Sequence, residues 1–198
     1  MAEEAEKAAW RSRLLAARAA LSSARLAAAA AEVTRHVLAG LAETTRIAAY
    51  VPVGAEPGSL DLLDRLSRRG TVILLPVVRP NLELDWAAYD GPAALTTGRW
   101  GLREPAVDRG EPARLHGVEA VLVPALAVDR QGTRLGRGGG YYDRALAGVP
   151  AAVPVVALLH DGELVPHLPV DRWDRPVTAA VTPSKGWTNL PLVPHHMS

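Results

Sequence analysis

The apolar residues of this chain follow two patterns along its length. In residues 4–41 they recur at helical intervals among strong helix formers, and neither glycine nor proline occurs until near the end of the segment. The sequence "LSSAR" around Ser22 offers a break and a new N-cap, so we predict two helices here. A shorter helix is predicted within residues 58–70, capped by Ser59 and ended by Gly70.

The second pattern is the continuous apolar run, which is typical of strands in a parallel sheet covered on both faces. Five strands are predicted on this basis, in residues 46–53, 71–78, 118–129, 152–159 and 176–182. Residues 82–90 alternate between apolar and polar positions and predict a strand nearer an edge. Residues 91–117 are rich in glycine, proline and charge and are predicted to form a long loop, while the tail after about residue 183 is predicted to be frayed.

Strand and helix signals alternate, which favours an α/β protein. We predict a three-layer α/β/α fold with a mostly parallel open sheet and helices on both faces. No internal repeat or shift in composition divides residues 1–198, so a single domain is expected. Ligands of such sheets bind beyond the carboxyl ends of the strands. The turns after Val53, Val78 and Asp129 would lie at that edge.

Composition and charge narrow the function classes. A net charge of +1 argues against a general nucleic-acid-binding surface, and the lack of cysteine excludes disulfides and thiolate zinc sites. The first residues contain no apolar stretch of signal-peptide length. The later alanine-rich run is interrupted by Glu32, Arg35 and His36, so it predicts no membrane span. We therefore expect a cytoplasmic protein without nucleic-acid or membrane partners.

The segment "RLGRGGGYYDR", residues 134–144, carries four glycines between arginines. Successive glycines can turn several backbone N–H groups toward one anion, and a helix beginning after them would add its positive end. Arg134 and Arg137 could supply forked hydrogen bonds to phosphate, and Asp143 could hold Mg²⁺ against it. We favour a phosphate cradle over the alternative of a glycine-rich hairpin or linker.

Two common phosphate motifs do not match this loop. A Walker loop would end in Gly-Lys-Ser/Thr, which is absent. The dinucleotide pattern would need glycine three places after Gly138, where this chain has Tyr141.

The longer segment "LVPALAVDRQGTRLGRGGGYYDRAL", residues 122–146, closely resembles the signature of the 5-formyltetrahydrofolate cyclo-ligase family, also called methenyltetrahydrofolate synthetases. The resemblance covers nearly the whole chain in family order. It continues through the N-terminal helix, "AAYVPVGAEPGSLDLL", "ILLPVV", "WGLREP" and "LVPHLPVDRWDRPVTAAVTP". It implies an enzyme that converts 5-formyltetrahydrofolate and ATP, with Mg²⁺, to 5,10-methenyltetrahydrofolate, ADP and phosphate. We expect a monomer.

The resemblance also implies the site residues. Those implied to bind the nucleotide are Lys7, Arg11, Arg134, Leu135, Gly136, Arg137, Gly138, Gly139, Gly140, Tyr141 and Tyr142. Those implied to bind the folate are Val51, Glu56, Trp100, Arg137, Gly138, Gly139, Gly140 and Tyr141. Arg137 and Tyr142 are the implied catalytic residues, and Asp143 and Asp174 the implied metal ligands.

Each isolated assignment has a structural alternative. Lys7 and Arg11 could form a solvated helix face, Glu56 could be a turn residue, Asp174 a cap or surface charge, and Trp100 an anchor of its loop on the core. The chain also departs from the family pattern at several places, namely Ala125, Val128, Glu163, Trp173 and Thr178. Two other functions stay open: an enzyme with the same ATP site acting on another formamide-bearing compound, such as a thiamin-related one, and a folate- or nucleotide-binding protein without turnover.

Overall fold

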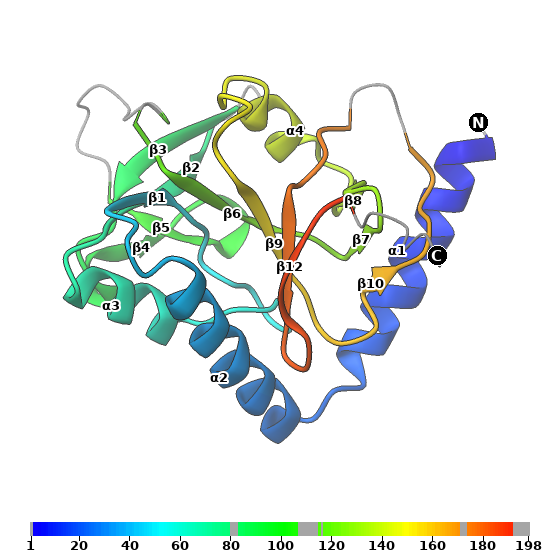
Figure 1. Cartoon of the computed structure of the whole chain (residues 1–198), viewed down its shortest axis with the longest axis horizontal. Helices are drawn as coiled ribbons and strands as arrows, with labels where there is room; N and C mark the ends of the chain where they lie inside the picture. The colour runs from blue at the N-terminus through cyan, green and yellow to red at the C-terminus, as the bar shows by residue number, and fades with distance from the viewer. Residues whose placement is uncertain (1, 80–82, 107–114, 116, 171–173, 192–198) are drawn as a thin grey trace, which may run out of the picture.

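A seven-stranded sheet forms the centre of the protein (Figure 1). The computed structural model describes residues 2–79, 83–106, 115, 117–170 and 174–191. In spatial order the strands are β12 (Gly186–Asn189), β11 (Ala179–Thr182), β9 (Val155–Leu158), β6 (Ala120–Pro124), β1 (Arg46–Ala48), β2 (Val72–Val78) and β3 (Leu84–Ala88). The five inner strands pair in parallel, and β3 and β12 pair antiparallel at the two edges. The predicted mostly parallel open sheet is confirmed.

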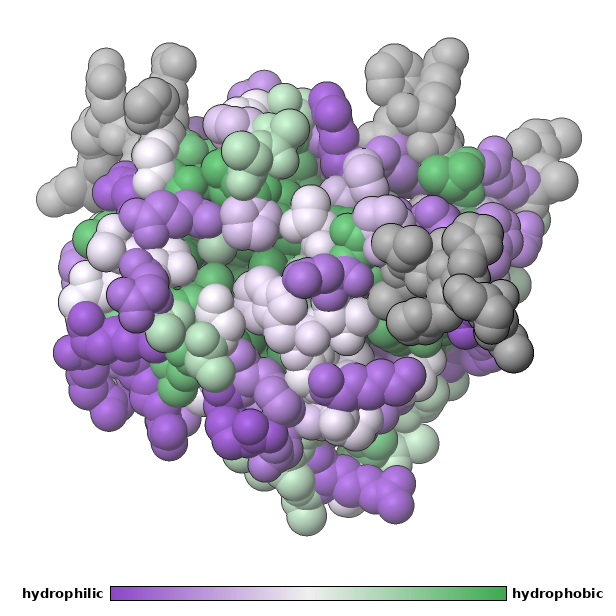
Figure 2. Space-filling model, in the orientation of Figure 1, coloured by the Kyte–Doolittle hydropathy of each residue, from purple (hydrophilic) through white to green (hydrophobic). Residues whose placement is uncertain are grey.

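Successive residues of a strand point to opposite faces of the sheet, and helices cover both faces. Ile47 packs with α2 (Ser23–Gly40) and α3 (Leu60–Arg68) in one core, while Ala48 belongs to the opposite core beneath α4 (Tyr141–Leu146). Figure 1 shows α2 and α3 side by side on one face and α4 on the other. In the same orientation, apolar residues show mainly in recesses between polar ones (Figure 2).

The helix N-termini follow the sequence signals. The hydroxyl oxygen of Ser22 accepts a hydrogen bond from the backbone N–H of Arg25 at 3.3 Å, and that of Ser59 accepts one from Leu62 at 3.0 Å. Each cap satisfies a backbone donor that has no partner within the first helical turn. The two predicted N-terminal helices, α1 (Ala2–Ala19) and α2, are therefore confirmed.

Helix α1 lies outside the sheet layers, beside a small second sheet of β10 (Leu164–Val165), β7 (Ala127–Asp129) and β8 (Arg134–Leu135). Leu14 of α1 packs there with Leu126, Leu135 and Leu168. This contact holds the polar face of α1 near the carboxyl edge of the central sheet. Among the described residues, no single helix has both the length and the apolar character to cross a membrane, and only α1 and α2 together, bent by 106°, pass on length and composition.

Three predictions about the bounds of strands and loops need correction. The single strand expected in residues 118–129 is two strands, β6 and β7, which belong to different sheets. The described part of the loop predicted in residues 91–117 holds the hairpin of β4 (Leu95–Thr97) and β5 (Arg103–Pro105), with the 3₁₀ turns Pro92–Ala94 and Arg99–Gly101. The expected strand in residues 46–53 already ends at Ala48.

The prediction of a frayed tail after about residue 183 is wrong for the segment up to Pro191, because β12 completes the edge of the sheet. Trp187 packs so closely over α2 that a Cβ atom on Gly40 would lie 2.5 Å from its ring. This contact between an aromatic residue and a glycine holds the strand in place. Residues 192–198 lie outside the described part of the chain.

Candidate active site

A cavity of about 560 Å³ opens at the carboxyl ends of β1, β2 and β6, where the parallel sheet predicted a site. All the residues that the sequence assigned to a ligand line it: Lys7, Arg11, Val51, Glu56, Trp100, Arg134, Leu135, Gly136, Arg137, Gly138, Gly139, Gly140, Tyr141, Tyr142, Asp143 and Asp174. These residues come from α1, from the loop after β1, from the β4–β5 hairpin, from β8 with the glycine loop and the start of α4, and from the segment before β11. The fold therefore gathers residues that lie up to 167 positions apart in sequence.

The glycine loop, residues 136–140, needs its glycines for two reasons. Gly138 and Gly140 have φ angles of +100° and +63°, which side chains other than glycine rarely adopt. At Gly139 the limit is space, since an added Cβ would lie 2.8 Å from the Tyr141 ring. Substitution at any of the three would distort the wall of the cavity.

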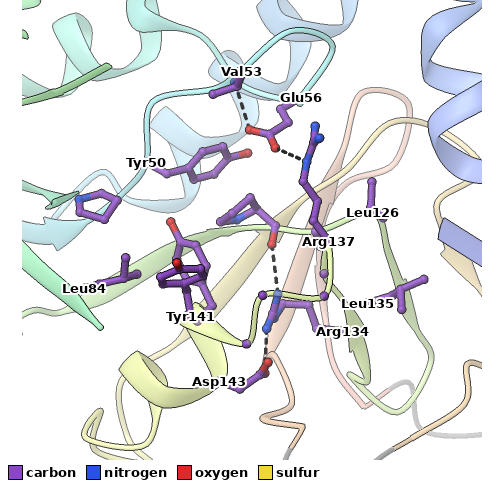
Figure 3. A pocket seen from close by; sticks show the side chains of 18 of the residues that line it. Tyr50, Val53, Glu56, Leu84, Leu126, Arg134, Leu135, Arg137, Tyr141 and Asp143 are labelled. Carbon is purple, nitrogen blue, oxygen red and sulfur yellow. Dashed lines mark hydrogen bonds and ion pairs between the residues drawn. The ribbon is translucent and has the colours of Figure 1, made fainter. Parts of the chain in front are cut away.

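Arg134 anchors this loop from below (Figure 3). Its guanidinium donates to Oδ1 of Asp143 at 2.7 Å and to the carbonyl of Pro124 at 3.4 Å. The side chain is buried, and its Nε has no hydrogen-bond partner within the described chain. In this conformation the guanidinium of Arg134 donates its hydrogen bonds to protein atoms. Its side chain therefore holds Asp143 and the loop in position.

Arg137 and Glu56 face one another across the cavity (Figure 3). Nε of Arg137 donates to Oε1 of Glu56 at 3.1 Å, and the backbone N–H of Val53 donates to Oε2 at 3.0 Å. The terminal nitrogens of Arg137 have no protein partner in the described residues, and the side chain is more than half exposed. Arg137 can therefore reach a second anion while it contacts Glu56.

The cations of α1 are not a solvated helix face. Lys7 is only 7% exposed, and its Nζ lies 2.6 Å from Oδ2 of Asp174. Nε of Arg11 donates to the carbonyl of Gly136 at 3.1 Å, and its NH1 donates to Oε1 of Glu4 at 2.7 Å. Arg11 thus contacts the glycine loop directly, whereas Lys7 contacts Asp174.

Among the aromatic residues, Trp100 is exposed and Tyr141 and Tyr142 are partly buried. Trp100 is 64% exposed with φ of +55°, and its ring meets Tyr141 edge-on at 5.9 Å between centroids, so it does not anchor its loop in the core. The hydroxyl of Tyr141 is buried without a partner among the described residues. Burial, reinforced by the negative charge of Glu56, raises the pKa of Tyr142 despite the opposing charge of Arg134. Tyr142 is therefore a protonated hydrogen-bond donor at neutral pH.

Asp143 pairs with Arg134 and Asp174 with Lys7. The segment of Asp174 contacts Asp143 through the backbone N–H of Arg175, which donates to Oδ1 of Asp143 at 3.4 Å. Among the described residues no group of three or more histidine and acidic side chains is arranged to hold a metal ion. The pair still fits Mg²⁺, which commonly binds one or two carboxylates and takes its remaining ligands from phosphate and water.

The lining residues that sequence reasoning missed include three polar ones, Arg18, Tyr50 and Glu104. Arg18 could have been found, because it is eleven positions after Lys7 and eleven residues are close to three helical turns. Glu163, one of the departures from the family pattern, forms an ion pair with this arginine. Thr178 binds the backbone of Val155, and Trp173 lies outside the described residues.

The fold and the site together define an α/β protein with a cationic, glycine-rich anion-binding loop at the carboxyl edge of its sheet. The sequence profile of the 5-formyltetrahydrofolate cyclo-ligase family matches residues 3–183, and the chain belongs to that family.

Individual relatives agree with this assignment. The chain is 43% identical over 145 residues to the 5-formyltetrahydrofolate cyclo-ligase of Mycolicibacterium smegmatis, covering 71% of this chain and 74% of the relative. It is 35% identical over 144 residues to that of Escherichia coli K12, covering 71% and 79%. The NMR structure of Aquifex aeolicus 5,10-methenyltetrahydrofolate synthetase is similar with a TM-score of 0.75 and 29% identity, covering 96% of this chain and 98% of that one.

Proposed function

We propose that the protein converts 5-formyltetrahydrofolate to 5,10-methenyltetrahydrofolate with ATP and Mg²⁺, releasing ADP and phosphate. Membership of the cyclo-ligase family supports this activity. The observation that carries it is the shared cavity, in which the glycine loop and the cations of α1 face Glu56 and Trp100. One wall suits a polyphosphate and the other a flat heterocycle. We further propose that the enzyme acts as a cytoplasmic monomer without nucleic-acid or membrane partners.

The reaction needs an activated formyl group, because the oxygen of a formamide is a poor leaving group. In the proposed sequence, that oxygen attacks the γ-phosphorus of ATP, and the bond to ADP breaks. N10 of the folate then attacks the formyl carbon and loses its proton. Cleavage of the carbon–oxygen bond releases phosphate and leaves the 5,10-methenyl bridge.

The protein would mainly orient the two substrates and stabilise charge on the transferred phosphoryl group. Lys7, Arg11 and the loop from Arg134 to Tyr142 would bind the triphosphate. Arg137 is best placed to follow the phosphoryl group, because its terminal nitrogens have no protein partner in the described residues and it lies beside Glu56. The protonated hydroxyl of Tyr142 would donate to the formyl oxygen.

Glu56 would accept hydrogen bonds from the N–H groups of the pterin edge, as a carboxylate suits donors of this kind. Its position is fixed before any ligand arrives, since the N–H of Val53 binds Oε2. Val51 and Tyr141 would line the same pocket, and the exposed ring of Trp100 would stack on an aromatic part of the folate. Asp143 and Asp174 would hold Mg²⁺, which neutralises charge on the phosphates when it is bound.

The test is the growth of the methenyl-folate absorbance band when purified protein is mixed with 5-formyltetrahydrofolate, Mg²⁺ and ATP. The proposal requires growth that depends on ATP. A folded protein that binds ATP but gives no band would favour another formamide-bearing substrate. Tight folate binding without ADP release would favour a protein that binds without turnover. Either result would overturn the proposal.

A further inference from the structure

We propose that His160 is a positioning residue. It links the buried Arg18–Glu163 pair to the turn that carries Glu56, and so helps to hold the Glu56 carboxylate where it would bind the pterin. This inference rests on the proposed function for the role of Glu56. It assigns a purpose to three buried polar side chains that the reaction itself does not use.

The network begins with a buried, doubly hydrogen-bonded ion pair. Nε and NH2 of Arg18 donate to the two carboxylate oxygens of Glu163 at 2.7 and 2.8 Å, and both side chains are under a tenth exposed. NH2 of Arg18 also donates to the carbonyl of Ala125 at 2.6 Å. Helix α1 is thereby joined to the loop after β6 and to the loop after β9.

Glu163 in turn fixes His160. Oε2 of Glu163 accepts a hydrogen bond from the backbone N–H of His160 at 2.8 Å. The imidazole Nε2 of His160 lies 2.9 Å from the carbonyl oxygen of Ala55. A carbonyl can only accept, so Nε2 carries the proton of this bond. The side chain is buried, so water does not compete freely with the bond.

Ala55 lies inside the turn that carries Glu56. The backbone N–H of Glu56 donates to the carbonyl of Val53 at 3.1 Å, and the N–H of Val53 donates to Oε2 of Glu56 at 3.0 Å. Because the turn closes on itself, Ala55 and the carboxylate of Glu56 move together. The imidazole of His160 is thus the link between this turn and the buried ion pair.

This network of hydrogen bonds holds the three loops after β1, β6 and β9 in fixed positions relative to one another. All three loops follow parallel strands and reach the same edge of the sheet. A loop that is already ordered loses less conformational entropy when a ligand binds. The ordered turn carries Glu56, so the effect applies to the part of the cavity proposed to bind the folate and not to the part proposed to bind the phosphates. Losing it should therefore raise the KM for 5-formyltetrahydrofolate without a matching change in the KM for ATP.

The test compares His160→Ala with His160→Gln. Both variants keep the backbone N–H that binds Glu163, so neither leaves the buried ion pair incomplete. The amide of glutamine can donate to the carbonyl of Ala55, whereas alanine cannot. A control is His36→Ala, since Nε2 of His36 lies 3.2 Å from the backbone carbonyl of Pro183 and 3.0 Å from the guanidinium of Arg35, outside the cavity lining.

We expect His160→Ala to raise the KM for 5-formyltetrahydrofolate by roughly five- to tenfold, the worth of one hydrogen bond. The KM for ATP and kcat should change by less than about twofold. His160→Gln should restore most of the loss, and the His36→Ala control should leave both KM values unchanged. Equal changes in both KM values, or no difference between the alanine and glutamine variants, would overturn the positioning role.

A second measurement separates this inference from the proposed function. Amide hydrogen exchange of Val53 and Glu56 in the ligand-free protein reports the stability of the turn without any turnover. Faster exchange in His160→Ala, but not in His160→Gln, supports the link even if the unmodified protein shows no cyclo-ligase activity. Unchanged exchange in His160→Ala refutes it, even if the enzyme is active.

Discussion

Removing one partner of the buried pair of Arg18 and Glu163 should lower the free energy of unfolding strongly. Replacing both partners should lower it much less. Arg18→Met leaves the carboxylate of Glu163 buried with only the N–H of His160 as a donor, since both bonds from the guanidinium are lost. Glu163→Leu leaves a guanidinium that keeps only the carbonyl of Ala125. Breaking a buried pair from one side typically costs about 3–5 kcal/mol.

The double variant Arg18→Met/Glu163→Leu removes both charges and fills similar volume. Replacement of a buried pair by apolar residues is often close to neutral, although the N–H of His160 would then lack its acceptor, at a cost of about 1–3 kcal/mol. We therefore expect the double variant to be more stable than either single variant. The coupling energy between the two positions should be several kcal/mol, on the order of one single-variant loss.

The assay is urea-induced unfolding of the four proteins, with the free energy of unfolding obtained by linear extrapolation. The matched control is the exposed pair of Arg35 and Glu32, whose nitrogen–oxygen distance is also 2.7 Å. Because that pair is solvated, Arg35→Ala should cost less than about 1 kcal/mol. Losses below about 1 kcal/mol in both single variants, or losses that simply add in the double variant, would refute the buried-pair argument.

Other predictions concern the cavity. Asp143→Asn keeps an acceptor for Arg134 and should preserve the fold, while turnover falls by about 100-fold or more if the carboxylate holds Mg²⁺; near-normal turnover would exclude that role. Glu56→Ala should raise the KM for 5-formyltetrahydrofolate by about 10- to 100-fold and leave the KM for ATP nearly unchanged, whereas equal losses would argue against a pterin contact. Trp100→Ala, at an exposed ring, should weaken folate binding by about tenfold in a direct titration with no loss of thermal stability, and a lower Tm would indicate a packing role instead. Burial raises the folded-state pKa of Tyr142 above the value of about 10 in an unfolded chain. The folded state therefore holds the Tyr142 proton more tightly than the unfolded state, and the stability this gives is fully present below about pH 10 and lost as the pH rises further. Tyr142→Phe should reduce this loss of stability at alkaline pH, measured by urea unfolding. An identical dependence of stability on pH in the variant would contradict the argument.

The sheet and the loop could be predicted because each follows from a local rule. The parallel strands are continuous apolar runs, and Ser22 and Ser59 mark helix starts by capping chemistry. The glycine loop was identifiable because Gly138 and Gly140 need backbone angles that other residues avoid. These signals lie within a few residues of the elements that they determine.

The rest depends on contacts between distant segments. Nothing near Trp187 in the sequence shows that it packs against Gly40, so the edge strand β12 was missed. The pairing of Arg18 with Glu163 and of His160 with Ala55 spans 145 and 105 positions. From the sequence alone, an isolated buried polar residue is predicted to lie on the surface or to cap a helix, because its partner is distant in the sequence. The family resemblance brought Lys7, Glu56 and Asp174 into the site where spacing alone could not.

The central claim is that ATP activates the formyl oxygen before the ring closes. The most direct measurement uses 5-formyltetrahydrofolate labelled with ¹⁸O in the formyl group and follows the label by mass spectrometry of the released phosphate. The proposed reaction predicts one ¹⁸O atom in each phosphate and equal amounts of methenyl product, ADP and phosphate. Unlabelled phosphate, with the ¹⁸O recovered in water while the methenyl product forms, would contradict the account.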